Sequence, residues 1–158
     1  MSADLDLTVQ IVPDQVARLV IEIERSGFNL RVCDPDQFAA RTRVLPCVHS
    51  SSGLPVDIVL SGPGIEEEFH DRALTVELAG IQIPFISPED LIVTKILAGR
   101  PKDVEDVVGV LRARGSSLDL ARVRRVLALL ESALGQSDLS PALAEALSRA
   151  GLKGQTQY

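Results

Sequence analysis

The chain has 158 residues, a net charge of −6 and 46% hydrophobic residues, which suits one domain with a buried core and at most a small helical appendage. The acidic balance disfavours a broad basic surface for duplex nucleic acid. No apolar run is long enough to span a bilayer, so we expect no membrane association. The sequence shows no signal peptide, and its two cysteines lack metal-ligand spacing. We therefore expect a cytoplasmic protein with reduced thiols and place Cys33 and Cys47 in core strands.

Apolar spacing in the first part of the chain predicts strands alternating with helices. Val16, Leu19 and Ile23 recur at helical spacing. Gly27 lies just past them, where a C-cap residue belongs. The expected elements are strands over 5–11, 28–33, 43–49 and 55–60, a helix over 14–26, and a short helix over 65–72. A turn at 34–36 is followed by a short polar piece that is at most one helical turn.

The second part of the chain predicts a hairpin followed by helices. Ser87 suits an N-cap, Pro88 the first helical position, and Glu89 the first turn. The expected elements are hairpin strands over 74–79 and 81–86 and helices over 88–98, 101–114, 118–134 and 140–150. We therefore expect an α/β (α+β) fold with a mixed sheet and a C-terminal helical segment. The expected organisation is a core over 1–115, C-terminal helices over 116–150 and a flexible tail over 151–158.

Two acids flank a single leucine at the head of the first expected strand. Asp4 and Asp6 are two residues apart, so a strand directs both carboxylates to one face. A third acid, Asp57, lies in another apolar strand segment. If these strands are neighbours, the three carboxylates converge and suit a hard divalent cation such as Mg²⁺. Ions held there would bridge the phosphates of a bound nucleotide, and the third acid would draw a proton from an attacking hydroxyl.

The same acids have a simpler explanation. Asp4 is then a solvated residue near a chain end, and Asp57 is an edge-strand charge that discourages aggregation. The residues alone leave both explanations open. His49 and His70 are isolated in the sequence, and we expect them to be structural or solvent-exposed rather than catalytic.

A basic segment follows the hairpin. Lys95 lies within an otherwise apolar helix face, where an ammonium group needs a partner. Arg100 and Lys102 flank a helix start, where backbone N–H groups also favour anions, so a phosphate pocket is expected. Asp103 and Asp106 are one helical turn apart and would orient the cations or cap the helix. The alternative is ordinary i,i+4 pairing such as Lys102 with Asp106, which we favour for Asp106, whereas we favour a functional role for Lys95.

A third basic group lies on the expected helix over 118–134. Arg122, Arg124 and Arg125 accompany an apolar stripe on that helix. Such a charge run is usually a solvated face, and only an RNA acceptor would give it a function.

These residues together resemble the minimal nucleotidyltransferases of the DNA polymerase β-like superfamily. The segment Ser2-Ala3-Asp4-Leu5-Asp6-Leu7 is similar to the Thr-x-Asp-Ile-Asp-Leu strand of the AbiEii/AbiGii toxin-like group, and Asp57 matches the third acid of that fold. The segments from Ser87 to Lys95 and from Arg100 to Asp106 resemble the second-half signature of the group. The resemblance covers nearly the whole chain up to about residue 115.

The resemblance implies a transferase that moves NMP from an NTP to an RNA or protein acceptor, with Mg²⁺ as cofactor. It implies Asp4, Asp6 and Asp57 as catalytic metal ligands. The phosphates would be contacted by Lys95, Arg100, Lys102 and Asp103. The toxins of this group belong to abortive-infection and toxin–antitoxin systems, so an antitoxin partner is a further implication.

The start of the chain departs from the family pattern. In the family, a Gly-Gly or Gly-Ser turn that opens a helix precedes the Asp-x-Asp strand and holds the triphosphate, whereas Met1 here falls inside the loop before Asp4. Weaker phosphate binding and an exposed apolar sheet face would follow, and we expect a second copy of the chain to cover that face as a homodimer. Two alternatives remain: a shortened, non-catalytic homologue acting as a binding or regulatory protein, and a chain whose true start lies upstream.

Overall fold

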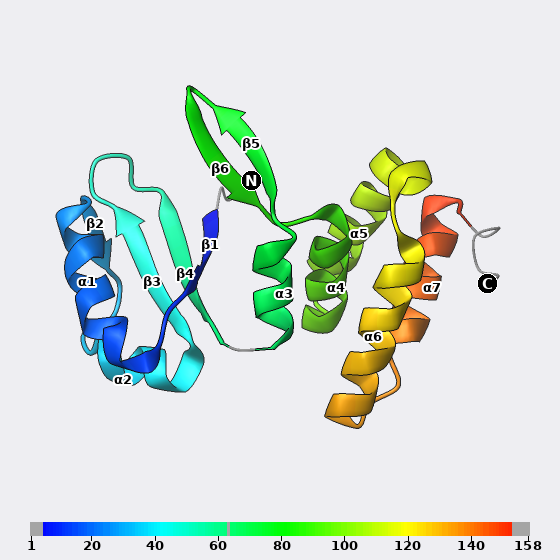
Figure 1. Cartoon of the computed structure of the whole chain (residues 1–158), viewed down its shortest axis with the longest axis horizontal. Coiled ribbons are helices and arrows are strands. Elements are labelled where there is room, and N and C mark those ends of the chain that lie inside the picture. The colour runs from blue at the N-terminus through cyan, green and yellow to red at the C-terminus, as the bar shows by residue number, and fades with distance from the viewer. Residues whose placement is uncertain (1–4, 63, 153–158) are drawn as a thin grey trace. The chain divides into compact units, whose positions relative to one another are not determined.

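Contacts within the chain group into two compact units, Met1–Asp71 and Arg72–Tyr158 (Figure 1). A computed structural model describes residues 5–62 and 64–152, apart from the side chain of Pro13. The first unit holds a mixed sheet with helices, and the second holds a hairpin and a set of helices. This is the expected α+β fold, with helices forming the C-terminal part of the chain.

A four-stranded mixed sheet is the frame of the first unit. Its strands lie in the order β1-β4-β3-β2, with β1 parallel to β4 and the other neighbours antiparallel. The elements are β1 (Leu5–Gln10), α1 (Val16–Arg25) after a 3₁₀ turn (Pro13–Gln15), β2 (Phe28–Leu30), α2 (Pro35–Thr42), β3 (Val44–His49), β4 (Pro55–Ser61) and α3 (Ile65–Asp71). The strands β1 and β4, far apart in the sequence, are therefore direct neighbours.

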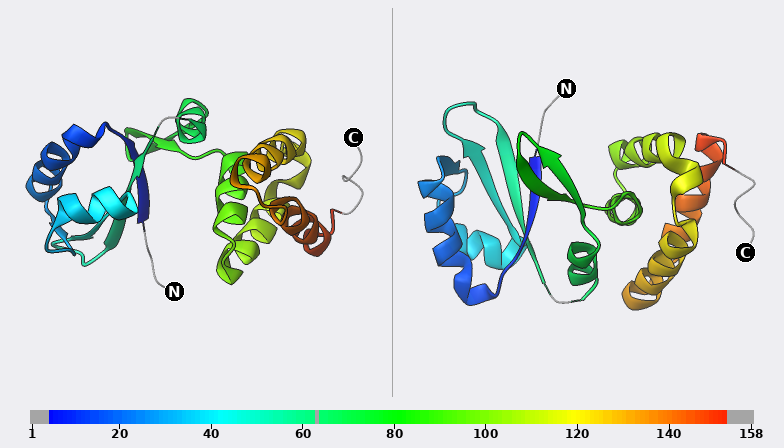
Figure 2. Two further views of the ribbon diagram at one scale, coloured as in Figure 1. Left: turned by 90° about the horizontal axis from the view of Figure 1, so that it is seen from below. Right: turned by 45° about the horizontal axis from the view of Figure 1, so that its top comes forward.

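The helices α1 and α2 cover one face of this sheet (Figure 2). Side chains of β4 alternate between the two faces, so Val56, Ile58 and Leu60 point toward these helices and are buried. The buried cluster on this face consists of Ile23, Ala39, Leu45, Cys47, Val56, Ile58 and Leu60. The alternate residues of β4, Asp57 among them, lie on the other face.

The segment after Asp34 forms a complete helix, α2, in place of the turn and the short piece of at most one helical turn expected there. The Asp34 carboxylate accepts the Gln37 N–H at 3.0 Å, and Pro35 occupies the first turn. The helix ends at Arg43, whose φ is 60° and whose Nε donates to the Leu60 carbonyl at 3.1 Å. The helix buries a single alanine, so its sequence lacks the apolar periodicity that would have predicted it.

The second unit consists of the β5–β6 hairpin and four α-helices. The elements are β5 (Leu74–Leu78), β6 (Ile81–Phe85), α4 (Pro88–Ala98), α5 (Pro101–Arg114), a 3₁₀ turn (Gly115–Ser117), α6 (Leu120–Leu134) and α7 (Leu139–Ala150). Residues from all four helices form its core: Ile92, Val93, Ile96, Val107, Val108, Leu111, Leu120, Val123, Val126, Leu127, Leu139, Leu143, Ala146 and Leu147. Gly99 ends α4 at φ 64°, a left-handed conformation that glycine adopts without strain.

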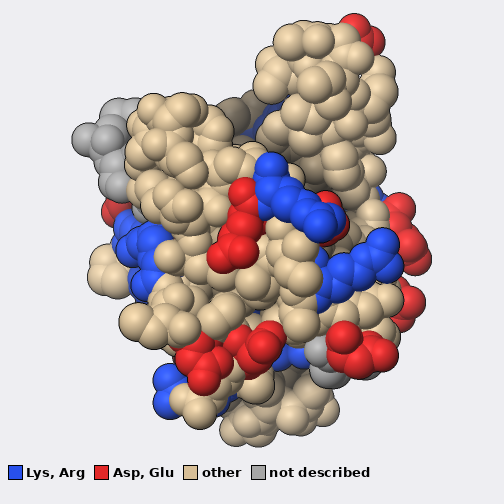
Figure 3. All heavy atoms as spheres, turned by 90° about the vertical axis from the view of Figure 1, so that its left-hand side faces the viewer, with Lys and Arg blue, Asp and Glu red and all other residues tan. Residues whose placement is uncertain are grey.

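On the side of the first unit that α1 and α2 form, acidic and basic side chains are interspersed, with no broad patch of one sign (Figure 3). Cys47 is buried as expected, but the core position expected for Cys33 is wrong, because β2 ends at Leu30 and Cys33 is exposed. None of the described helices has the length and apolar character needed to cross a membrane.

Candidate functional site

The strand register places Asp6 directly beside Asp57. The strands β1 and β4 are parallel, and Asp6 is the Cα partner of Asp57. Neighbouring strands lie about 4.8 Å apart, and laterally paired residues point to the same face. Both carboxylates therefore lie on the sheet face opposite α1 and α2, as the pairing of the two expected strands implied.

No basic side chain neutralises these two carboxylates among the described residues. Asp6 is exposed and Asp57 is half-buried, and neither makes an ion pair in the part of the chain that the structure describes. The Asp57 charge also acts on Cys47, whose side chain lies on the other face of the sheet. Burial is the largest cause that raises the pKa of the Cys47 thiol, the Asp57 carboxylate is the second, and Arg31 has a smaller opposite effect.

A hard divalent cation fits this pair of carboxylates. Proteins bind Mg²⁺ through one or two carboxylates together with substrate phosphates and water, so two adjacent aspartates suffice as the protein ligands. The third expected ligand, Asp4, lies outside the described residues. Across residues 5–62 and 64–152, no group of three His, Cys, Asp or Glu side chains is placed to hold a metal.

A buried serine ties α3 to the strands that carry the acids. The Ser61 Oγ donates to the Val9 carbonyl at 3.2 Å and lies 3.0 Å from His70 Nε2. Because the one hydroxyl proton goes to Val9, the His70 Nε2–H is the donor of the second bond. Nearby, the Gly62 N–H donates to Glu66 at 2.6 Å. His70 thus has a structural partner, in line with the expectation that it is not catalytic.

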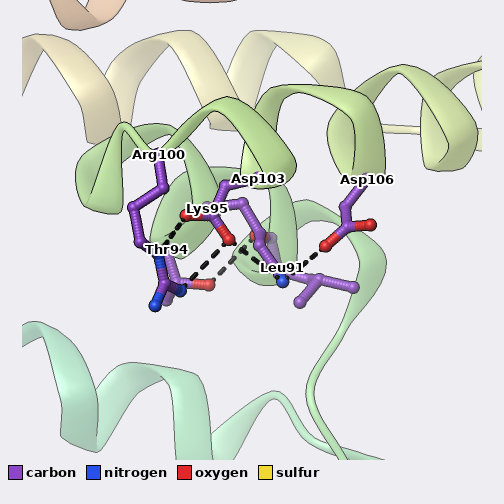
Figure 4. Close-up of polar contacts among 6 residues, drawn as sticks. All are labelled: Leu91, Thr94, Lys95, Arg100, Asp103 and Asp106. Carbon is purple, nitrogen blue, oxygen red and sulfur yellow. Dashed lines mark hydrogen bonds and ion pairs between the residues drawn. The ribbon is translucent and has the colours of Figure 1, made fainter. Parts of the chain in front are cut away.

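The basic residues expected to bind phosphate form an ion-pair cluster in the second unit (Figure 4). Lys95 Nζ lies 3.2 Å from Asp103 Oδ1 and 2.7 Å from Asp106 Oδ2. Arg100 holds Asp103 through two contacts, Nε to Oδ2 at 2.6 Å and Nη2 to Oδ1 at 3.1 Å. The Asp103 side chain is fully buried. Because it lies on α5 and binds Lys95 of α4, it joins these two helices. The partner of Asp106 is therefore Lys95 and not Lys102, the partner that simple helix spacing suggested.

The ion pairs of this cluster perturb the ionisation of its members. Hydrogen bonds from Arg100 first, and from Lys95 next, hold the pKa of Asp103 below its ordinary value despite the burial of the carboxylate. Hydrogen bonds to Asp106 first, and then to Asp103, raise the pKa of Lys95. The cluster is therefore charged on both sides at neutral pH.

The two cations of the cluster remain partly accessible. The Lys95 side chain is 26% exposed and that of Arg100 is 59% exposed, while Lys102 is exposed on the first turn of α5. Both cations therefore keep part of their surface in solvent, although Asp103 and Asp106 already neutralise much of their charge. Phosphate binding by Lys95, Arg100 and Lys102, with Asp103 beside them, stays a prediction.

Sequence reasoning missed a second buried carboxylate, Asp90. Its Oδ2 accepts from the Ser87 hydroxyl at 2.7 Å and lies 3.4 Å from Arg72 Nε, and its Oδ1 lies 2.8 Å from Arg122 Nη2. The side chain of Arg122 is 10% exposed, so it does not belong to a solvated basic face with Arg124 and Arg125. The burial of Arg122 could have been predicted from spacing, because Arg122 precedes the buried Val126 by four residues and so lies on the same helix face.

Residues 6–132 match a protein family described as nucleotidyltransferases of unknown function (DUF6036). The chain belongs to this family. The match begins at Asp6 and includes Asp57 and the whole Lys95 cluster, whereas Asp4 precedes it. No curated protein shows significant similarity to the chain. The family membership supports the nucleotidyltransferase resemblance at this coarser level, and the AbiEii/AbiGii-type assignment stays a prediction.

Proposed function

We propose that the protein is a Mg²⁺-dependent nucleotidyltransferase that moves NMP from an NTP to a hydroxyl of an RNA or a protein. The observation that carries this proposal is the parallel register of Asp6 beside Asp57. Two adjacent carboxylates without a cationic partner among the described residues repel each other. Such a pair is stabilised when a divalent cation binds, and family membership supports nucleotide chemistry at the site.

In this proposal Asp6 and Asp57 are the described residues that hold the cation, and Asp4 is the third proposed ligand. The cation would supply charge neutralisation to the phosphates as the bond to the leaving group breaks. Asp57, the third acid of the proposed site, would also accept the proton of the acceptor hydroxyl. Lys95, Arg100 and Lys102 are proposed separately as phosphate contacts of the second unit.

Calorimetric titration with each NTP in Mg²⁺ tests the cation site. We expect metal-dependent binding by the wild type, a loss of at least about tenfold in affinity for Asp6→Asn and for Asp57→Asn, and no change for Asp36→Asn. The control removes the same charge from α2, which covers the other face of the sheet. Equal loss in all three variants would mean that general charge, and not the Asp6–Asp57 pair, governs binding.

Transfer is tested with α-labelled NTPs and a mixture of total RNA and proteins. Label in RNA or in protein identifies the acceptor class, and its absence from the Asp6→Asn reaction assigns transfer to the proposed site. Metal-dependent binding without any transfer would favour the non-catalytic, regulatory alternative. A toxin role, with an antitoxin partner, predicts growth arrest on expression of the wild type but not of Asp6→Asn.

A further inference from the structure

The β5–β6 hairpin presents an apolar face built from both of its strands. Alternation places Leu74, Val76 and Leu78 of β5 on one face. The antiparallel register pairs them with Phe85, Ile83 and Ile81 of β6. The face thus consists of three rows of paired apolar side chains, which we call the hairpin patch: Leu74–Phe85, Val76–Ile83 and Leu78–Ile81.

The hairpin patch is among the most exposed apolar surface of the molecule. Val76 is 46% exposed, Leu78 60% and Ile81 64%. The other face of the hairpin is different, because it carries Thr75, Glu77 and Gln82 together with Pro84. A hairpin with one apolar face and one polar face normally buries the apolar face, but no residue of β5 or β6 is buried.

Such a hairpin needs a covering layer. A two-stranded hairpin is at best marginally stable in water unless further strands or a packed layer cover its apolar face. The buried core of the second unit is formed by its helices and includes no hairpin residue. Monomeric proteins rarely expose contiguous apolar patches larger than a few hundred Å².

We propose that the hairpin patch is a self-association surface, and that its occupant is the hairpin patch of a second copy of the chain. Five side chains exposed by about half or more, together with the less exposed Ile83, give for two copies an area approaching the ~1,000 Å² that a specific interface requires. The patch contains no charged residue, so two identical patches meet without like-charge repulsion across their centre. The net charge of −6 opposes self-association in general, so an uncharged patch is a suitable surface for two copies to meet.

The arrangement of rows favours face-to-face stacking of two hairpins. A two-fold axis through the central Val76–Ile83 row places this row against its own copy, and the outer rows exchange partners, as an isologous interface requires. Pairing through the β6 edge is disfavoured, because Pro84 lacks a backbone N–H. Stacked sheets lie about 10 Å apart, so the proposed dimer has a small β-sandwich at its centre.

Sedimentation equilibrium over a wide range of concentrations tests the proposal on the full chain. We expect a dimer for the wild type, a dissociation constant raised at least about a hundredfold for Val76→Lys and Ile83→Lys, and an unchanged dimer for Thr75→Lys and Gln82→Lys. The four variants add the same charge to the same two strands and differ only in the face of the hairpin that carries the lysine. A monomeric wild type, or equal effects of the two pairs of variants, would overturn the proposal.

A cross-linking experiment covers the case in which a lysine unfolds the hairpin. Val76→Cys and Thr75→Cys are made in a Cys33→Ser background, because Cys33 is exposed. A short bismaleimide is used, because it joins two thiols over a wider range of distances than a disulfide, which needs Cα atoms within about 7 Å of each other. Covalent dimers of Val76→Cys but not of Thr75→Cys support the proposal, and the reverse result contradicts it. Neither readout depends on nucleotide binding, so failure here leaves the proposed transferase activity unaffected.

Discussion

Single residues in the second unit show two different ways of keeping a carboxylate buried. Asp103 is paired with two cations that remain partly in water, whereas Asp90 is paired with Arg122, which is itself almost fully buried. A buried charge is tolerated only when it is paired and hydrogen-bonded. The exposure of the partner therefore decides how much each pair contributes to stability.

Asp103→Asn should lower the free energy of unfolding by about 1–3 kcal/mol, because the charge-assisted hydrogen bonds from Lys95 and Arg100 are weakened at a buried site. Asp106→Asn should cost less than about 1 kcal/mol, because Asp106 is 54% exposed and its pair with Lys95 is screened by water. Urea unfolding at neutral pH measures both. Equal losses in the two variants would show that burial of Asp103 is unimportant for the cluster.

The same cluster predicts a pH dependence with a definite sign. The pKa of Asp103 is lowered by folding from an ordinary value of 3.8, so the unfolded chain binds its proton first as the pH falls. The stabilisation by Asp103 is complete above about pH 4 and is lost as the pH falls through the lower pKa of the folded state. The difference in unfolding free energy between wild type and Asp103→Asn should therefore shrink on going from pH 7 to pH 3. A constant difference would contradict the lowered pKa.

Arg122→Ala should be more damaging than a surface arginine substitution. It leaves Asp90 fully buried with only Ser87 and the more distant Arg72 as partners, which should cost about 3 kcal/mol. Arg125→Ala, on the exposed side of the same helix, should change stability by less than about 0.5 kcal/mol. Thermal or urea unfolding distinguishes the two, and similar small effects would show that Asp90 tolerates the loss.

The candidate site was predictable from the sequence only in part. Asp6 and Asp57 each lie in an apolar strand segment, and their convergence was predicted on the condition that the two strands are neighbours. The pairing of β1 with β4 meets that condition. The Asp90–Arg122 pair joins residues 32 positions apart on different helices, and no local pattern specifies which helices pack together. Likewise, helix spacing suggested Lys102 as the partner of Asp106, while the packing of α4 on α5 brings Lys95 to it instead.

At the scale of elements, local signals predicted the helices and strands that have strong caps or strong periodicity. The start of α4 at Ser87-Pro88 and its end at Gly99 agree with the cap residues, and the hairpin turns at Ala79-Gly80, both with positive φ. The helix α2 was missed because only one of its residues is buried. The strand β2 is short because its extent is set by pairing with β3, which sequence periodicity does not encode.

The N-cap of α4 offers a test at this scale. Ser87 Oγ accepts the Asp90 N–H at 3.1 Å and donates to the Asp90 carboxylate at 2.7 Å. Ser87→Ala removes both bonds at a buried position, so the unfolding free energy should fall by about 2 kcal/mol. Ser140→Ala, whose exposed hydroxyl donates to Glu131, should lose less than about 1 kcal/mol. Equal losses in chemical denaturation would mean that the cap contributes nothing beyond an ordinary surface bond.

At the scale of the whole molecule, net charge and the hairpin patch act in opposite directions on self-association. The chain carries a charge of −6, so two copies repel each other at neutral pH. Substitution of one residue by lysine reduces this to −5, so general electrostatics would not weaken association. Loss of the dimer in Val76→Lys would therefore run against the charge effect and would report on the patch itself.

Ionic strength separates these two contributions. Raising NaCl from roughly 0.05 M to 0.5 M shortens the screening length well below 10 Å and weakens repulsion between the copies. The apolar contact does not weaken under the same change. The dissociation constant of the dimer should therefore fall severalfold with added salt, as measured by sedimentation equilibrium. A dissociation constant that rises with salt would mean that ion pairs hold the copies together, which the uncharged hairpin patch cannot supply. In Thr75→Lys the same trend should persist with a smaller slope, because the net charge of each copy falls from −6 to −5.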